Sequence, residues 1–128
     1  MKKPLLMLVV VLLTASLTGI AYSQETKTQL TPEQRAQKIT DWMKTNLKLT
    51  DAQVPQVQTI NLSHAQKTEE IKNGTLDQNQ KMSALKTDNE EKEKEFKKVF
   101  TPEQYSAYEA KKAELKAEMK KYYKEKNG

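Results

Sequence analysis

Apolar residues recur along the chain at spacings of three and four, and no stretch shows the strict alternation that is typical of a β-strand. The pattern predicts four helices, over residues 31–47, 50–73, from 75 or 77 to 99, and 101–126. Their apolar faces consist of Ala36, Ile39, Met43 and Leu47; of Val54, Val57, Ile60, His64 and Ile71; of Met82, Leu85, Phe96 and Val99; and of Tyr105, Tyr108, Leu115, Met119 and Tyr122. Because the connections are short, helices that follow one another must run antiparallel. The sequence therefore predicts an all-α fold of four amphipathic helices in long antiparallel hairpins.

Two of the four apolar faces are interrupted by polar side chains. The third face carries Asn89 and Lys92 at positions where apolar residues are expected, and the fourth is broken by Lys112. Leu, Ile, Val and Phe together make up only 15 of the 105 residues that follow position 23, which is a small supply of core-forming side chains. A thin core of this kind is often completed by association of two chains. We therefore expect an elongated protein that forms a homodimer.

The first 23 residues combine the features of a secretory signal peptide. Lys2 and Lys3 form a basic start, and residues 5–17 are an uncharged, mostly apolar run. Ala21 and Ser23 supply the small residues that a signal peptidase reads, which predicts cleavage after Ser23. We therefore expect an exported, periplasmic protein.

The alternative to cleavage is a retained membrane anchor, since residues 5–22 are about long enough to span a bilayer. We favour cleavage, because the basic start, the short apolar run and the small-residue exit occur together in export signals. Cleavage leaves a polar lead over residues 24–30, a helical domain over residues 31–128, and no stable membrane anchor.

Charge and residue types exclude several classes of function. Loss of Lys2 and Lys3 lowers the formal net charge from +5 to +3, and the remaining charges alternate in sign along the chain, so nucleic acid is not an expected partner. The chain contains no Cys and hence no disulfide or thiolate chemistry. After the leader only Gly74 and Gly128 are glycines, so no phosphate-binding loop is present. The sequence predicts neither an enzyme nor a cofactor site.

His64 is the single histidine, and it is the weak candidate for a metal ligand, with Glu69, Glu70 or Met82 as companions. Zinc sites usually have three or four His, Cys or carboxylate ligands. One histidine per chain permits such a site only where subunits share it. A histidine that simply lies on a helix face is the favoured interpretation.

One five-residue phrase occurs three times, as LTPEQ, LTDAQ and FTPEQ. The nine positions that define it are Leu30, Thr31 and Gln34; Leu49, Thr50 and Gln53; and Phe100, Thr101 and Gln104. Thr followed by Gln three residues later is the spacing of a capping box, in which each side chain bonds the backbone N–H of the other residue. The phrases therefore predict helix starts, with apolar staples from Leu49 to Val54 and from Phe100 to Tyr105. Pro55 lies just inside the second helix and predicts a bent start there.

These phrases, in a small, exported, Cys-free chain rich in Lys, Glu and Gln, resemble the L-T-x-x-Q motif family of Spy-like and CpxP-like periplasmic proteins. The likeness covers residues 30–122, and the second and third phrases match the family's pair best. The chain departs from the pattern in Phe100, in Pro55 and in the additional phrase at residues 30–34.

The resemblance implies a cradle-shaped antiparallel homodimer that acts as an ATP-independent chaperone for unfolded or partly folded envelope proteins. It also allows an accessory protein that regulates an envelope-stress or metal-responsive sensor kinase, and a passive helical spacer is the third alternative. Methionine and aromatic side chains adapt to varied surfaces, which makes several of them candidates for contact with clients. These are Trp42, Met43, Leu62, Met82, Tyr122 and Tyr123.

Overall fold

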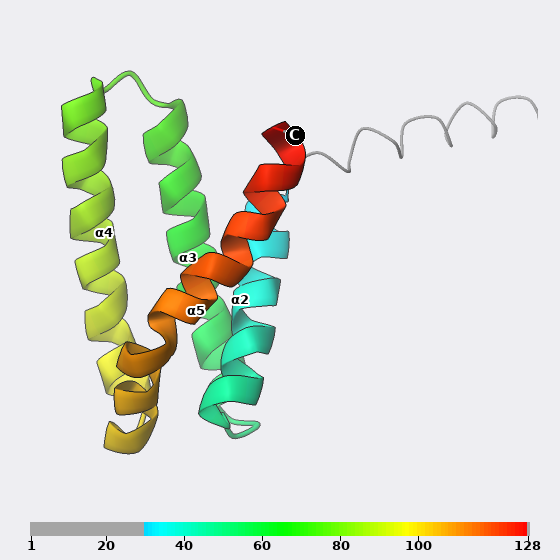
Figure 1. Cartoon of the computed structure of the whole chain (residues 1–128). Coiled ribbons are helices and arrows are strands. Elements are labelled where there is room, and N and C mark those ends of the chain that lie inside the picture. Colours follow the sequence, from blue (N-terminus) through cyan, green and yellow to red (C-terminus); the bar gives the residue numbers. More distant parts are fainter. Residues whose placement is uncertain (1–29, 128) are drawn as a thin grey trace, which may run out of the picture.

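The computed structural model describes residues 30–127, and the side chains of residues 30–122. The chain forms α2 (Pro32–Leu47), α3 (Gln53–Asn73), α4 (Gln78–Val99) and α5 (Pro102–Asn127) in this order (Figure 1). The prediction of an all-α fold is confirmed. The expected signal peptide, most of the polar lead and the side chain of Tyr123 lie outside the described part. Within that part, no helix is sufficiently long and apolar to cross a membrane.

Helices α2, α3 and α4 form a layer of antiparallel neighbours in which α3 lies in the middle (Figure 1). The buried positions of α2 include Ala36, Met43 and Leu47, as the three-and-four spacing predicts. In α3, Val57 and Ile60 are buried against them. A buried polar link adds to this packing, because Asn61 Nδ2 donates to Thr40 Oγ1 at 3.0 Å.

Helix α5 departs from the predicted hairpin arrangement. It remains beside α4 only near their short connection and then crosses the layer diagonally towards the beginning of α2 (Figure 1). The middle of α4 presents Asn89 and Lys92 where an apolar seam would be needed, whereas α2 presents Ile39 and Trp42, which are partly buried at the core. The apolar side of α5 therefore packs mainly against α2, and α4 and α5 lie side by side as the predicted hairpin only near their connection.

The core lies where the ends of the helices converge. Phe96 is fully buried, and its ring stacks on Phe100 with a centroid distance of 5.0 Å. Tyr108 from α5 meets Phe96 edge-on at 5.4 Å, a favourable geometry for aromatic rings. The remaining buried members of this cluster are Met43, Leu47, Leu49, Val57 and Ile60.

Helix α3 begins later than the repeated phrase predicts. The side chains of Thr50 and Gln53 bond each other's backbone N–H, yet the regular helix starts at Gln53 instead of directly after Thr50. Pro55 has no N–H with which to close a helical bond to the carbonyl of Asp51. The chain therefore makes a turn over residues 51 and 52 before the regular helix begins.

Lys48 ends α2 in the left-handed conformation, with φ 55° and ψ 54°. A side chain with a Cβ is disfavoured there by about 1 kcal/mol, whereas glycine adopts this conformation freely. Lys48→Gly should therefore raise the free energy of unfolding by about 0.5–1 kcal/mol, measured by urea denaturation. Lys44→Gly, inside the same helix, is the control and should lower it by about 1 kcal/mol. A loss of stability in Lys48→Gly would contradict this interpretation.

Candidate functional site

The second and third phrases meet in space through their glutamines, 51 positions apart in the chain. Gln53 Nε2 donates to Gln104 Oε1 at 2.7 Å, and Gln104 Nε2 donates to Gln53 Oε1 at 2.9 Å. Each Nε2 also donates to a backbone carbonyl, Gln53 to Val99 and Gln104 to Lys48, at 2.9 Å and 3.3 Å. The pair therefore connects the starts of α3 and α5 to the ends of α2 and α4.

The same carboxamides also cap their own helices. Gln53 Oε1 accepts from the backbone N–H of Thr50, and Gln104 Oε1 accepts from that of Thr101, both at 2.9 Å. The two Thr hydroxyls accept from the backbone N–H groups of the two glutamines in return. Each carboxamide oxygen and nitrogen thus has two partners. The predicted capping role is present, and the long-range connection adds to it.

The first phrase caps α2 without meeting another phrase. Thr31 and Gln34 bond each other's backbone N–H at 2.9 Å and 3.1 Å. Next to them, the guanidinium of Arg35 donates to the Leu30 carbonyl at 3.0 Å and lies 3.3 Å from the carboxylate of Glu69 in α3. Arg35 therefore makes a polar link to α3 at the position where the other phrases carry an apolar residue.

A fourth capping box is present at the start of α4, where the sequence analysis placed only a helix boundary. Asp77 accepts from the backbone N–H of Gln80 at 2.8 Å, and Gln80 accepts from that of Asp77 at 3.2 Å. The signal was available in the sequence, because the Asp–Gln spacing equals the Thr–Gln spacing of the repeated phrase.

His64 lies between two carboxylates of α4. Its Nδ1 is 2.7 Å from Asp88 and its Nε2 is 3.2 Å from Glu95, while the side chain is only 10% exposed. The two carboxylates face different nitrogens of the ring, so they do not converge with a ring nitrogen on one point. Among the described side chains, those of residues 30–122, no group of three or more His, Cys, Asp or Glu residues could hold a metal ion. His64 thus connects α3 to α4.

The candidates for client contact differ in their exposure. Met43 is 1% exposed and belongs to the core, so the expectation that it contacts clients is corrected. The i, i+4 spacing that places Met43 on the apolar face of α2 does not show whether another helix covers that face.

Trp42, Leu62 and Tyr122 are half-buried, while Met82 is 61% exposed despite its predicted place on an apolar face. It lies in the first turns of α4, near the hairpin connection, where residues 72–80 are all exposed.

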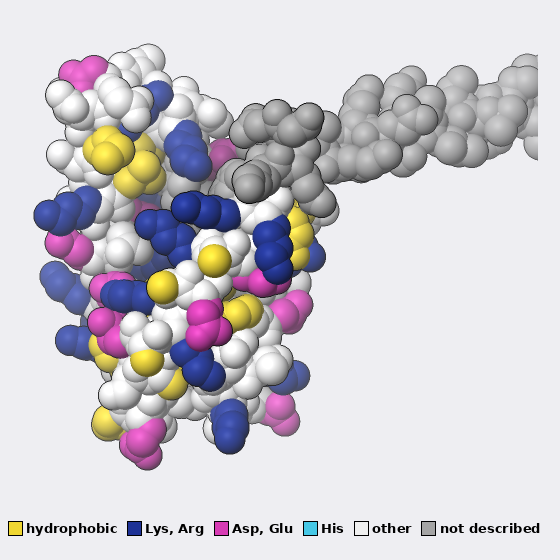
Figure 2. All heavy atoms as spheres, viewed as in Figure 1, with side chains coloured by type: hydrophobic (Ala, Val, Ile, Leu, Met, Phe, Trp, Pro, Cys, Tyr) yellow, Lys and Arg dark blue, Asp and Glu magenta, His cyan; other side chains and the backbone are white. Residues whose placement is uncertain are grey.

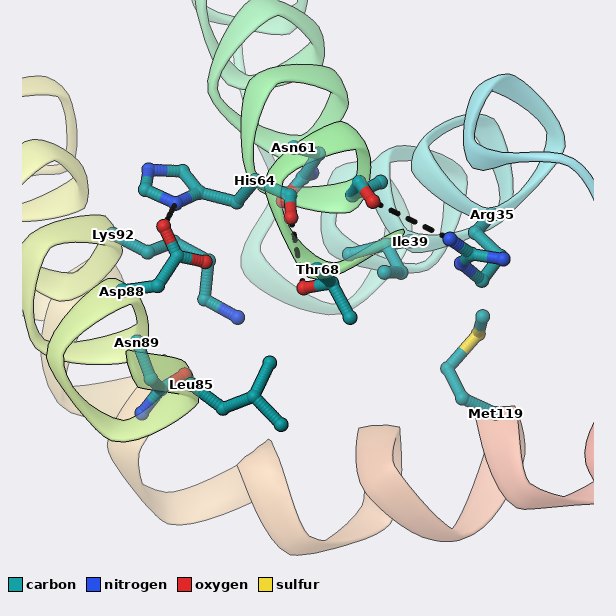
Figure 3. A pocket seen from close by; sticks show the side chains of 11 residues that line it. Arg35, Ile39, Asn61, His64, Thr68, Leu85, Asp88, Asn89, Lys92 and Met119 are labelled. Atoms are coloured by element: carbon teal, nitrogen blue, oxygen red, sulfur yellow. Dashed lines mark hydrogen bonds and ion pairs between the residues drawn. The ribbon is translucent and has the colours of Figure 1, made fainter. Parts of the chain in front are cut away.

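A cleft opens where α5 leaves α4. It consists of two adjoining hollows of about 280 and 510 Å³, and both are lined by Ile39, Asn89, Lys92 and Met119. Figure 2 shows Lys and Arg side chains (dark blue) gathered in the hollow of this face, between the α3–α4 hairpin and α5. In Figure 3, Leu85 and Lys92 of α4 and Met119 of α5 point into the same space.

The lysines of the cleft have different surroundings. Lys112 Nζ lies 3.0 Å from both Glu93 and Glu109, and these hydrogen bonds raise the pKa of Lys112. Burial lowers the pKa of Lys92, although the charges of Glu93 and Asp88 partly oppose this shift. Within the described part of the chain, the side-chain amine of Lys92 makes no hydrogen bond and no ion pair. The residue that interrupts the predicted seam of α4 is therefore the one that brings a partly desolvated amine into the cleft.

Of three comparisons with known proteins, the one with protein-family models gives a match. Searches of curated proteins and of solved structures each found no match to this chain. The resemblance to the L-T-x-x-Q family stays a prediction. A family model described as a domain of unknown function, DUF4890, matches residues 21–108, which include α2, α3, α4 and the first turns of α5. With more than half of its length matched, the chain belongs to the DUF4890 family.

Proposed function

We propose that this protein is exported to the periplasm and acts there as an ATP-independent, chaperone-like protein without enzymatic activity. It binds unfolded or stressed envelope proteins weakly and reversibly, as a homodimer. The signal-peptide features of residues 1–23 and the resemblance of the repeated phrases support this proposal.

The observation that carries the proposal is the exposed apolar surface near the α3–α4 connection. Leu76 is 43% exposed and Met82 is 61% exposed, and they are the exposed large hydrophobic side chains in the described part of the chain. Methionine has a flexible and polarisable side chain that adapts to varied apolar partners. Lysines near this surface would attract acidic segments at longer range. Together these properties suit weak contact with unfolded chains of different sequence.

The purified protein is expected to slow the aggregation of a denatured client at near-stoichiometric amounts, without ATP. Light scattering follows the aggregation, and a sizing measurement on the same sample tests the homodimer. The double variant Leu76→Ser, Met82→Ser should lose most of this effect, because the two apolar contacts are removed. Its free energy of unfolding should change by less than about 1 kcal/mol, since both side chains are exposed.

The matched control is Ala110→Ser, Ala117→Ser, which changes two exposed positions of α5 and should keep the full effect. If the protein without substitutions leaves the aggregation kinetics of the denatured client unchanged, the chaperone proposal is overturned. A pull-down from envelope extracts then separates the alternatives, since a regulator of a sensor kinase should recover one partner. A passive spacer should recover none.

A further inference from the structure

We propose that the cleft between α4 and α5 binds a small amphipathic carboxylate of the medium-chain fatty acid class. The carboxylate binds the amine of Lys92, and the alkyl chain lies along the apolar side chains of α2, α4 and α5. This inference goes beyond the proposed function, because it concerns a small molecule in the cleft and not a polypeptide at the α3–α4 connection.

The charges of the cleft identify Lys92 as the binding cation. Arg35 is occupied by Glu69, and Lys112 is occupied by Glu93 and Glu109. Asp88, four residues before Lys92, is held by His64 at 2.7 Å. Lys92 thus keeps its three N–H donors without a hydrogen-bond acceptor among the described side chains.

Burial of Lys92 adds a reason for an anionic ligand. Its surroundings disfavour the ammonium form, which is why the pKa is lowered. A carboxylate placed against the amine would offset that cost and would form a charge-assisted hydrogen bond. Lys116 lies exposed at the edge of the cleft and adds attraction for an approaching anion.

The apolar part of the lining fits an alkyl chain. Side chains from three helices provide the apolar surface: Ile39, Leu85, Ala113, Leu115 and Met119. The larger hollow, at about 510 Å³, has the size of ordinary small-molecule sites. Figure 3 shows Leu85 and Met119 facing the same space as the Lys92 amine. An anion and an apolar chain can therefore be bound together.

The same lining disfavours two other kinds of ligand. A phosphate ester with a second negative charge would meet the carboxylates of Asp88 and Glu93, which also line the cleft. An extended peptide would bring backbone N–H and C=O groups to the aliphatic part of the wall, at Ile39, Leu115 and Met119, where they would lose hydrogen bonds to water without replacement. A single carboxylate with an alkyl chain brings one negative charge and no backbone amides, so it meets less repulsion than a phosphate ester and leaves no peptide group without a hydrogen bond.

The test is a titration followed by two-dimensional NMR. The protein is purified in the form that accumulates in cells and is titrated separately with octanoate, 1-octanol and butyrate. Octanoate should give saturable shifts at cleft residues such as Ile39, Leu115 and Met119. 1-Octanol, which has the chain without the charge, and butyrate, which has the charge with a short chain, should each bind at least tenfold more weakly. Lys92→Met should weaken octanoate binding about tenfold and leave 1-octanol binding unchanged.

Two matched pairs of variants locate the site: Lys92→Met with Lys94→Met, and Ala113→Trp with Ala110→Trp. Lys94→Met changes an exposed lysine on the same helix and should have no effect. Ala113→Trp fills the cleft from an exposed position and should weaken octanoate and 1-octanol alike, whereas Ala110→Trp, outside the lining, should weaken neither. Octanoate shifts that do not saturate, that fall outside the cleft, or that persist unchanged in Lys92→Met would overturn the proposal. Shifts of the cleft residues by an unfolded client, with no saturable shift by octanoate, would assign the cleft to polypeptides and would also overturn the proposal.

Discussion

Replacing Phe96 with Ala should lower the free energy of unfolding by about 3–5 kcal/mol, the range for removal of a large buried aromatic side chain. Phe96 is fully buried and meets two further rings, Phe100 at 5.0 Å and Tyr108 at 5.4 Å. These rings join the end of α4 to the start of α5, so the cavity would open where the helices converge. Small domains are stable by only about 5–15 kcal/mol. The variant should therefore be largely unfolded at moderately raised temperature.

Urea denaturation followed by circular dichroism measures this loss. The control is Met82→Ala on the same helix, which removes an exposed side chain and should change the free energy of unfolding by less than about 0.5 kcal/mol. If Phe96→Ala and Met82→Ala cost the same, the assignment of the core to the ends of α4 and α5 would be wrong.

Replacing Gln53 with Ala should lower the free energy of unfolding by about 2–4 kcal/mol, because four hydrogen bonds are lost at once. These bonds join Gln53 to Thr50, to the carbonyl of Val99 and, twice, to Gln104. The carboxamide of Gln104 would remain partly buried with fewer partners, which adds to the cost. The loss should thus exceed that of an ordinary helix cap.

Gln34→Ala is the matched control, because Gln34 makes the same capping box without a partner phrase. It should cost about 1 kcal/mol or less. A double-mutant cycle of Gln53→Ala and Gln104→Ala should give a coupling energy of about 1–2 kcal/mol. Equal losses in Gln53→Ala and Gln34→Ala, together with a coupling near zero, would show that the phrases act only as local caps.

The local structure of this chain could be predicted well. The cap of α2 at Thr31, the end of α3 at Asn73 and the end of α4 at Val99 agree with the sequence analysis. Caps and helix periodicity depend on residues three or four positions apart, so a single sequence contains the required information. The start of α3 was harder to place, because Pro55 competes with the capping box that precedes it.

Arrangements between distant segments could not be predicted in the same way. The sequence places Met43 and Met82 on apolar faces alike, but the structure buries one at 1% exposure and leaves the other at 61%. Whether a face is covered depends on which other helix packs on it, and periodicity carries no information on that choice. Likewise, nothing local to Gln53 or Gln104 indicates that their carboxamides meet.

The sequence by itself determined four helices, most of their ends and which side chains share a face of each helix, because these follow from hydrogen bonding and spacing within single segments. Only the tertiary structure decided that α5 leaves α4 and crosses to α2, and with it the pairing of the two glutamines and the cleft around Lys92. The physical reason is a competition between surfaces. Ile39 and Trp42 give α2 an apolar surface on which α5 packs, whereas the middle of α4 is polar, and the choice between them depends on residues far apart in the chain.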